Sequence, residues 1–264
     1  METESHTTRL GILGAGCIGT AIVKALLDGR LSYRLAHVLD SEAARAEALM
    51  ELAGEQPAAS TLEELCRDSD VIVECAHPSA VAPLVECARS VSAGRSGDQH
   101  IVVLSVGGLL DVEFHNRPAH EPAVHVLSGA LGGLDAVLAL RQAGLESVEL
   151  TSRKPPAGLG LDVTEETVVF EGTAAEVIRL YPKNTNVAVA LSLAGIGPER
   201  TRMRLIADPA IDRNVHHLVA RGAAGEVEFT SRNVPFPENP KTSYLAALSA
   251  IAVLGNLGSS LRIG

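Results

Sequence analysis

The sequence is poor in aromatic side chains. Its 264 residues include four phenylalanines, three tyrosines and no tryptophan, although 46% of the residues are hydrophobic. A hydrophobic core must therefore be built from Ala, Val, Leu and Ile side chains. The chain is too long for one small core, and its length suits two domains.

Basic residues are also scarce, with 22 Lys and Arg against 32 Asp and Glu, which leaves a formal net charge of −10. Nucleic acids and anionic membrane surfaces bind basic proteins, so this balance argues against both as partners. The polar N-terminus METESHTTR has no signal-peptide core, and the apolar segment YLAALSAIAVLGNLG is too short to span a bilayer. We therefore expect a soluble, cytoplasmic protein.

The four cysteines lie in the first third of the chain and lack the paired spacing of zinc sites; they are Cys17, Cys66, Cys75 and Cys87. Each falls within an apolar or helical pattern, which is typical of free thiols in a reducing compartment rather than of disulfides. No group of His, Cys, Asp and Glu has the spacing of metal ligands, so we expect no metal.

In the first half of the chain, apolar strand patterns alternate with helical ones. This βαβαβ order predicts a doubly wound, Rossmann-type parallel sheet over residues 1–128. Ser41 is placed to cap the second helix. The strands are expected at 8–16, 34–40, 69–76, 99–106 and 123–129, and the helices at 19–29, 41–54 and 79–90.

From about residue 130 the pattern changes to short strands with period-two alternation and inserted helices. Such runs predict an α+β domain with a mostly antiparallel sheet over residues 129–239, within an overall α/β fold. The segment 239–257 is apolar on nearly all sides and predicts a buried helix, so we expect residues 240–264 to pack back on the first domain. The second domain's strands are expected at 146–152, 166–170, 202–208, 214–220 and 226–231, and its helices at 133–144, 173–181 and 184–195.

A glycine-rich turn follows the first strand and opens the first helix. In such a turn Gly14 permits the tight bend, Gly16 lets a pyrophosphate approach the backbone, and Gly19 lets helix and strand pack closely. Asp40 ends the second strand and is suited to bind ribose hydroxyls, which favours NAD, while Arg45 leaves NADP possible. The alternative is a glycine turn without a ligand. The expected cofactor contacts here are Gly14, Gly16, Cys17, Ile18, Gly19 and Asp40.

Two adjacent histidines stand in the strand NVHHLVA. Neighbouring strand residues point to opposite faces, so His216 shares a face with Asn214, whereas His217 shares the other with Val215 and Val219. We expect the valine face to be packed and His217 to be a core residue. His216 is the candidate general acid/base, because imidazole, with a pKa near ~6.5, exchanges protons around neutrality.

Six stretches together resemble the L-aspartate dehydrogenase family over essentially the whole chain: LGILGAGCIG, LSGALGGLDAV, TSRKPPAGL, PKNTNVAVALSLAG, the Asp-Pro…Asn-x-His pattern and NPKTS. The resemblance implies NAD(P)-dependent oxidation of L-aspartate to iminosuccinate, which water converts to oxaloacetate and ammonia. It also implies a product that can feed pyridine-nucleotide biosynthesis, and a homodimer formed through the second domain's sheet.

The resemblance also implies roles for single residues. His216 takes the place of the catalytic histidine, Ala130 that of a nicotinamide-side contact, and Asn186 that of a cofactor-contacting asparagine, with Asn184 a near alternative. The sequence departs from the family after the third long strand, where small or acidic residues are replaced by His77.

L-Aspartate carries two carboxylates, so at least one cation should bind them. Lys183 is a rival base or a carboxylate ligand, and Lys154 and Lys241 are similar candidates. The candidate substrate contacts are Lys183, Asn184, Asn214, Lys154 and His77.

Two other functions remain open on the residues alone. One is a Rossmann-type reductase of an imine or aldehyde, of the dihydrodipicolinate reductase or homoserine dehydrogenase kind. The other is a non-catalytic NAD(H)-binding protein, in which replacement of His216 would change nothing measurable.

Overall fold

The structure is a computed structural model, and it describes residues 7–54, 58–59, 61–92, 95, 97–114, 121–181, 185–237 and 239–262. The chain forms two compact units. The first contains the chain up to Leu127 and again from Ala250, and the second is Ser128–Ser249. The chain therefore returns to the first unit within its last helix.

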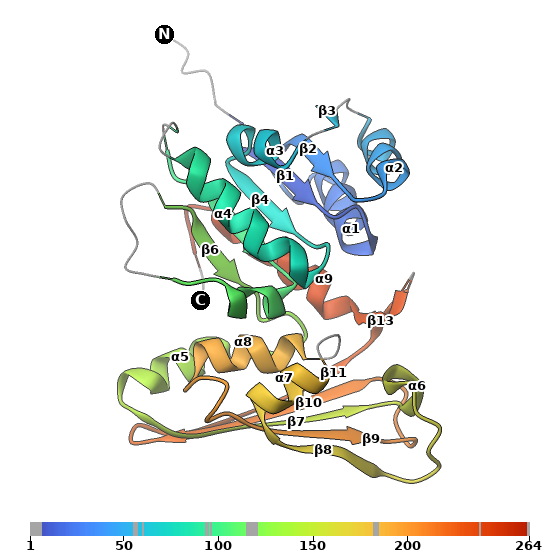
Figure 1. Cartoon of the computed structure of the whole chain (residues 1–264), viewed down its shortest axis with the longest axis vertical. Coiled ribbons are helices and arrows are strands. Elements are labelled where there is room, and N and C mark those ends of the chain that lie inside the picture. The colour runs from blue at the N-terminus through green and yellow to red at the C-terminus, as the bar shows by residue number, and fades with distance from the viewer. Residues whose placement is uncertain are drawn as a thin grey trace. The chain divides into compact units, whose positions relative to one another are not determined.

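The first unit is built on a six-stranded, all-parallel sheet of strand order β3-β2-β1-β4-β5-β6 (Figure 1). All four residues of β4 are buried, as expected of a parallel sheet that is covered on both faces. The doubly wound fold expected from the sequence is confirmed. The strands are β1 (Arg9–Leu13), β2 (Arg34–Leu39), β3 (Ala58–Ala59), β4 (Val71–Glu74), β5 (His100–Val103) and β6 (Ala123–Val126).

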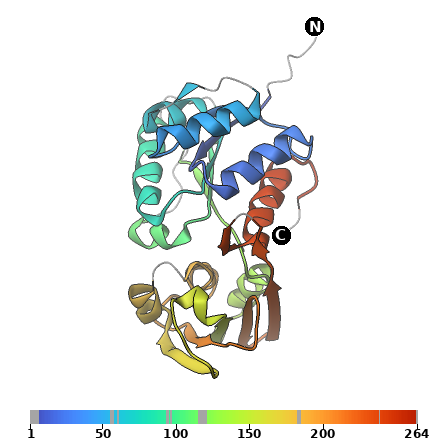
Figure 2. The ribbon, with the colours of Figure 1, turned by 90° about the vertical axis from the view of Figure 1, so that its right-hand side faces the viewer.

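Helices cover both faces of this sheet (Figure 2). One face packs an aliphatic core with α1, α2 and the second half of α9 (Tyr244–Leu257). This core includes Ile22, Leu49 and Leu254. The expected cap Ser41 is wrong by one residue, because the N-cap of α2 is Glu42 and the helix begins at Ala43. The helical elements are α1 (Cys17–Leu27), α2 (Ala43–Ala53), α3 (Leu62–Asp68), η1 (Pro78–Ala80), α4 (Val81–Ser92) and η2 (Val106–Asp111).

The second unit has a five-stranded sheet of order β11-β10-β7-β9-β8. Its described pairs are antiparallel except for β7 with β9, so the mostly antiparallel sheet is confirmed. Three helices lie over one face of it, α5, α7 and α8 (Figure 1). The elements are α5 (Leu134–Gln142), β7 (Leu145–Lys154), α6 (Pro156–Leu159), β8 (Thr167–Thr173), α7 (Ala174–Leu180), α8 (Asn186–Ala194), β9 (Arg202–Ala207), β10 (Asn214–Gly222) and β11 (Gly225–Asn233).

The two faces of this second sheet differ in a way that corrects one prediction. The helix-covered face of β10 carries the even-numbered side chains, including Leu218 and His216, which are buried. The other face carries His217, whose Nε2 lies 2.8 Å from Glu228 Oε1, and the ion pair of Arg221 with Glu149. Within the chain itself the valine face is therefore not packed, contrary to the expectation, since valine also suits the uncovered face of a strand.

The C-terminal segment also differs from the prediction. Residues of the NPKTS stretch form β13 (Asn239–Ser243), which pairs with β12 (Pro235–Phe236), and α9 (Tyr244–Leu257) begins only after it. Along α9 the buried positions are Ala247, Ala250 and Leu254, a single helical stripe, so burial on nearly all sides is wrong. No helix in the described part of the chain is long and apolar enough to cross a membrane.

Candidate cofactor and substrate sites

The turn between β1 and α1 uses its three glycines for different purposes. Gly14 has φ +106°, and a Cβ there would stand 2.7 Å from the backbone nitrogen of Ala76. A Cβ on Gly19 would stand 2.6 Å from the carbonyl oxygen of Gly14. Around Gly16, in contrast, nothing lies within 4 Å of the position of a Cβ. Gly14 and Gly19 thus close the turn, and Gly16 leaves its backbone open to a ligand.

Helix α1 starts directly after the open position, with Gly16 as its N-cap and Cys17 and Ile18 in its first turn. The first turn contains no acidic side chain, so the positive end of the helix dipole is not offset there. An open backbone at a helix N-terminus is the arrangement that binds phosphate groups. These residues therefore fit a dinucleotide.

The carboxylate of Asp40 is held beside this turn. Its Oδ2 accepts a hydrogen bond from the backbone N–H of Ala15 at 2.7 Å, and its Oδ1 accepts one from the backbone N–H of Glu42 at 2.8 Å. Each carboxylate oxygen has a second lone pair, which leaves acceptors for ribose hydroxyls. Arg45, the residue that left NADP possible, pairs with Glu42 at 2.9 Å.

The end of β4 carries an acid that the sequence reasoning missed. Glu74 is fully buried, and its carboxylate accepts hydrogen bonds from the backbone N–H groups of Ala76 and Ser105, each at 2.9 Å. Burial raises the pKa of this carboxyl despite these donors. Glu74 thus binds the backbone at Ala76, which lies 2.7 Å from the position of a Cβ on Gly14. The sequence did offer a sign of this role, because Glu74 is the one acidic residue in β4, after three apolar ones.

His77 lies just beyond that loop and is exposed. Its Nδ1 accepts a hydrogen bond from the backbone N–H of Ser79 at 3.3 Å and lies 2.9 Å from the Ser79 hydroxyl. The ring thereby caps η1.

In the second unit, His216 stands in the middle of β10 and is 3% exposed. Across the sheet it is in register with Ser152 on β7 and Ser231 on β11. The Nδ1 atom of His216 lies 2.8 Å from Ser152 Oγ. The next row toward the sheet's interior is apolar, with Leu150 and Leu218 opposite one another. The histidine thus stands where the apolar core gives way to polar side chains.

Lys154 lies two residues beyond Ser152 on the same face and is 8% exposed. Burial lowers the pKa of its ammonium to about 8. Burial, and after it the charge of Lys154, lowers the pKa of His216 to about 3. At neutral pH the second unit therefore holds a neutral imidazole near a buried cation.

Ala130 is hydrogen-bonded to two polar side chains of β11, the strand next to β10. Its carbonyl oxygen accepts hydrogen bonds from Ser231 Oγ at 2.9 Å and from Asn233 Nδ2 at 2.8 Å. Asn214 faces Asn233 across the strands. The structure thus brings Lys154, His216, Asn214 and Ala130 together. Sequence reasoning missed Ser152, Ser231 and Asn233, although their alternation with charged residues along β7 and β11 marked them as inward-facing.

Three further candidates lie near the start of α8. Asn186 is the first residue of this helix and is exposed, following the buried N-cap Thr185. Lys183 and Asn184 lie outside the described residues. The competition between Lys183 and His216 as the base therefore stays a prediction.

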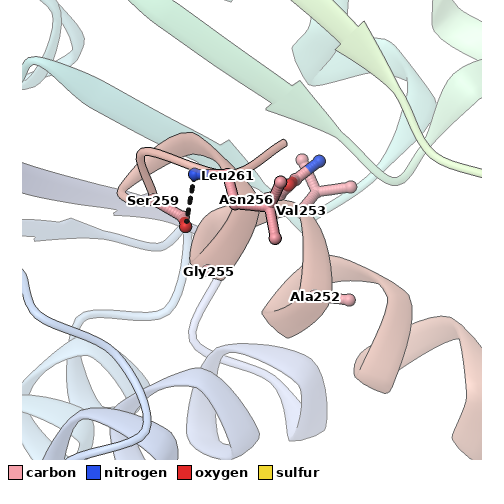
Figure 3. A pocket seen from close by; sticks show the side chains of 6 residues that line it. All are labelled: Ala252, Val253, Gly255, Asn256, Ser259 and Leu261. Atoms are coloured by element: carbon pink, nitrogen blue, oxygen red, sulfur yellow. Dashed lines mark hydrogen bonds between the residues drawn. The ribbon is translucent and has the colours of Figure 1, made fainter. Parts of the chain in front are cut away.

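A shallow hollow is found at the C-terminal end of α9 (Figure 3). Among the residues that line this hollow, the backbone N–H of Leu261 donates a hydrogen bond to Ser259 Oγ at 3.1 Å, drawn as a dashed line in Figure 3. None of its lining residues is titratable, so it offers no acid or base. They are Ala252, Val253, Gly255, Asn256, Ser259 and Leu261.

The chain is similar to known dehydrogenases along nearly its whole length. The family described as "Aspartate dehydrogenase, C-terminal" matches residues 135–257, and "Homoserine dehydrogenase, NAD binding domain" matches residues 14–117. L-Aspartate dehydrogenase of Methanosarcina mazei is 40% identical over 274 residues, which cover 97% of this chain and 99% of the relative. That of Methanocella arvoryzae is 40% identical over 273 residues with the same coverage. The crystal structure of aspartate dehydrogenase from Thermotoga maritima has a TM-score of 0.70 at 26% identity, covering 98% of this chain and 100% of that one.

Proposed function

Because the chain belongs to the L-aspartate dehydrogenase family, we propose that it oxidises L-aspartate to iminosuccinate with His216 as general acid/base. It is an NAD(P)-dependent oxidoreductase that acts on a CH–NH2 group. The observation that supports the assignment of His216 is the neutral, buried imidazole near the buried Lys154 ammonium. Buried groups with perturbed pKa values cluster at functional sites, and a cation beside a proton acceptor suits an anionic substrate that must lose a proton.

The cofactor would be held by the turn from Gly14 to Gly19, with the pyrophosphate at Gly16 and the adenosine ribose at Asp40. When bound, NAD(P)⁺ supplies the hydride acceptor. Asp40 would repel a 2′-phosphate, and Glu42 offsets the charge of Arg45, which favours NAD over NADP. Ala130 and Asn186 are proposed contacts to the cofactor on the strength of the resemblance.

Lys154 would bind a carboxylate of L-aspartate, with Asn214 as a polar neighbour. A charge-assisted hydrogen bond to a carboxylate is among the stronger polar contacts that a protein makes. A carboxylate placed at Lys154 would also offset the positive charge that, after burial, contributes to the lowered pKa of His216. The imidazole would then become a better base once substrate is bound. Lys183, Asn184 and His77 are proposed substrate contacts of lower rank.

His216 would take one proton from the substrate ammonium, and the electron pair freed on nitrogen would form the C=N bond. As that bond forms, the hydride leaves Cα with the electron pair of the Cα–H bond. The product is iminosuccinate in its protonated, iminium form, to which water then adds with release of ammonium and oxaloacetate. A base of this kind contributes on the order of 10²–10⁴-fold to the rate.

The test is an NADH-formation assay on wild type, His216→Ala and Lys183→Ala against a panel of amino and hydroxy acids that includes L-aspartate. We expect L-aspartate to be the preferred substrate, and kcat to fall about a hundredfold or more in His216→Ala while NAD affinity changes little. Full activity of His216→Ala with loss of activity in Lys183→Ala would transfer the role of base to Lys183. Oxidation of a hydroxy acid in preference to L-aspartate would refute the substrate.

On the resemblance we also propose a cytoplasmic homodimer whose product feeds pyridine-nucleotide biosynthesis. The dimer would form through the uncovered sheet face of the second unit, where charged side chains such as Arg221 and Glu149 pair within the chain. Analytical ultracentrifugation measures the oligomeric state directly. A monomer at assay concentrations would refute the proposed interface.

A further inference from the structure

A serine stands on each side of His216. Ser152 on β7 and Ser231 on β11 are its register partners, so the three side chains form one row across adjacent strands on the covered face. Ser231 uses its hydroxyl to donate to the carbonyl oxygen of Ala130, at 2.9 Å. Ser152 instead places its Oγ 2.8 Å from Nδ1 of the imidazole.

We propose that Ser152 is a positioning residue for the oxidation: its Oγ accepts the Nδ1–H of His216 and leaves the Nε2 lone pair to take the substrate's proton. This inference rests on the proposed role of His216. It assigns Ser152 a function that is exerted through the imidazole ring of His216.

The direction of this hydrogen bond follows from the protonation states that a base must pass through. A neutral imidazole carries one N–H, and Nδ1 is occupied by Ser152. If Ser152 donated, Nε2 would carry the proton and the ring could not act as a base there. If Ser152 accepts, Nε2 has its lone pair before the transfer. After the transfer both nitrogens carry protons and Ser152 still accepts, so the contact survives without rearrangement.

Burial makes this contact difficult to replace. Ser152 is fully buried and His216 nearly so, and therefore water cannot readily take the place of the hydroxyl. Burial, and after it the charge of Lys154, disfavours the imidazolium and lowers the pKa of His216. A hydrogen-bond acceptor at Nδ1 opposes that effect, since it stabilises the protonated ring. Ser152 would thus both select the tautomer and support the proton that His216 receives.

The kinetic test compares Ser152→Ala, Ser152→Thr and Thr151→Ala with wild type. Thr151→Ala is the matched control, because it removes a hydroxyl from the adjacent β7 position, which faces the other side of the sheet opposite His217. We expect Ser152→Ala to lower kcat about 10–100-fold, with KM for L-aspartate and the Kd of NADH within about twofold of wild type. Ser152→Thr restores most of kcat, and Thr151→Ala retains it. Wild-type kcat in Ser152→Ala, or an equal loss in Thr151→Ala, overturns the inference.

A spectroscopic test needs no folded Ser152 variant. Histidine-selective ¹⁵N NMR of the wild-type protein reports the tautomer of each of its nine histidines, and subtraction of the His216→Gln spectrum identifies the signals of His216. We expect the Nδ1–H tautomer in the wild type. The Nε2–H tautomer overturns the inference. If His216→Gln is fully active, the proposed function fails; if it is inactive while Ser152→Ala is fully active, only the role of Ser152 fails.

Discussion

Replacing Lys154 by methionine should make the protein more stable and less active. Burial lowers the pKa of this ammonium from 10.5 to about 8. This fall in pKa means that the charged lysine costs about 3 kcal/mol of folding free energy at pH 7. Because the folded-state pKa is the lower one, this cost is complete below pH 8 and disappears as pH rises from about 8 to 10.5.

The assay is urea denaturation of wild type and Lys154→Met at pH 7 and at pH 9. At pH 7 the free energy of unfolding should be higher in the variant by up to about 3 kcal/mol, and at pH 9 the difference should be smaller. Methionine fills a similar volume without a charge, so packing changes little. The exposed Lys24 on α1 provides the control, since Lys24→Met should alter stability by no more than about 0.5 kcal/mol.

The same variant tests the role of the cation in function. Without a partner for the substrate carboxylate, kcat/KM for L-aspartate should fall about a hundredfold, which corresponds to roughly 3 kcal/mol of lost charge-assisted binding. Loss of more than about 1 kcal/mol of stability at pH 7 would refute the reasoning from burial. Wild-type kcat/KM would refute the carboxylate contact, whatever happens to stability.

Two further predictions follow from the other groups. The pKa of His216 is lowered to about 3, so between about pH 3 and 6.5 the folded protein binds fewer protons at this residue than the unfolded chain does. The free energy of unfolding should therefore fall as pH falls, and the part due to His216 should reach about 2 kcal/mol at pH 5. Urea denaturation should show that this part of the loss is absent in His216→Gln. If both proteins lose stability equally, the burial of a neutral imidazole is not its cause. Asp40→Ala should weaken NAD more than NADP, and Glu42→Gln should release Arg45 and raise the NADP-to-NAD ratio of kcat/KM by a fewfold, about 0.5–1 kcal/mol for an exposed pair. If the NADP-to-NAD ratio of kcat/KM falls in either variant, the adenosine ribose does not bind at Asp40.

Much of the fold was predictable because its signals are local. Strand alternation, the helix pattern and the glycine turn (Gly14, Gly16 and Gly19) each depend on residues that are close together in the sequence. Parity likewise separated His216 from His217 without coordinates. The NPKTS stretch was missed as a strand, because its pairing with β12 depends on neighbours and its residues have low strand propensity.

The sequence by itself determined the order of the elements, the glycine turn and the fact that the two histidines face opposite ways, because all of these follow from local backbone geometry. Only the tertiary structure decided which face the helices cover, and therefore that His217 lies among exposed charges. The tertiary structure also decided that the Ser152 hydroxyl contacts the ring of His216, which lies 64 residues later in the sequence, and that Lys154 is buried. Burial and contacts between distant strands set the pKa values of a site, and neither is a property of a segment on its own.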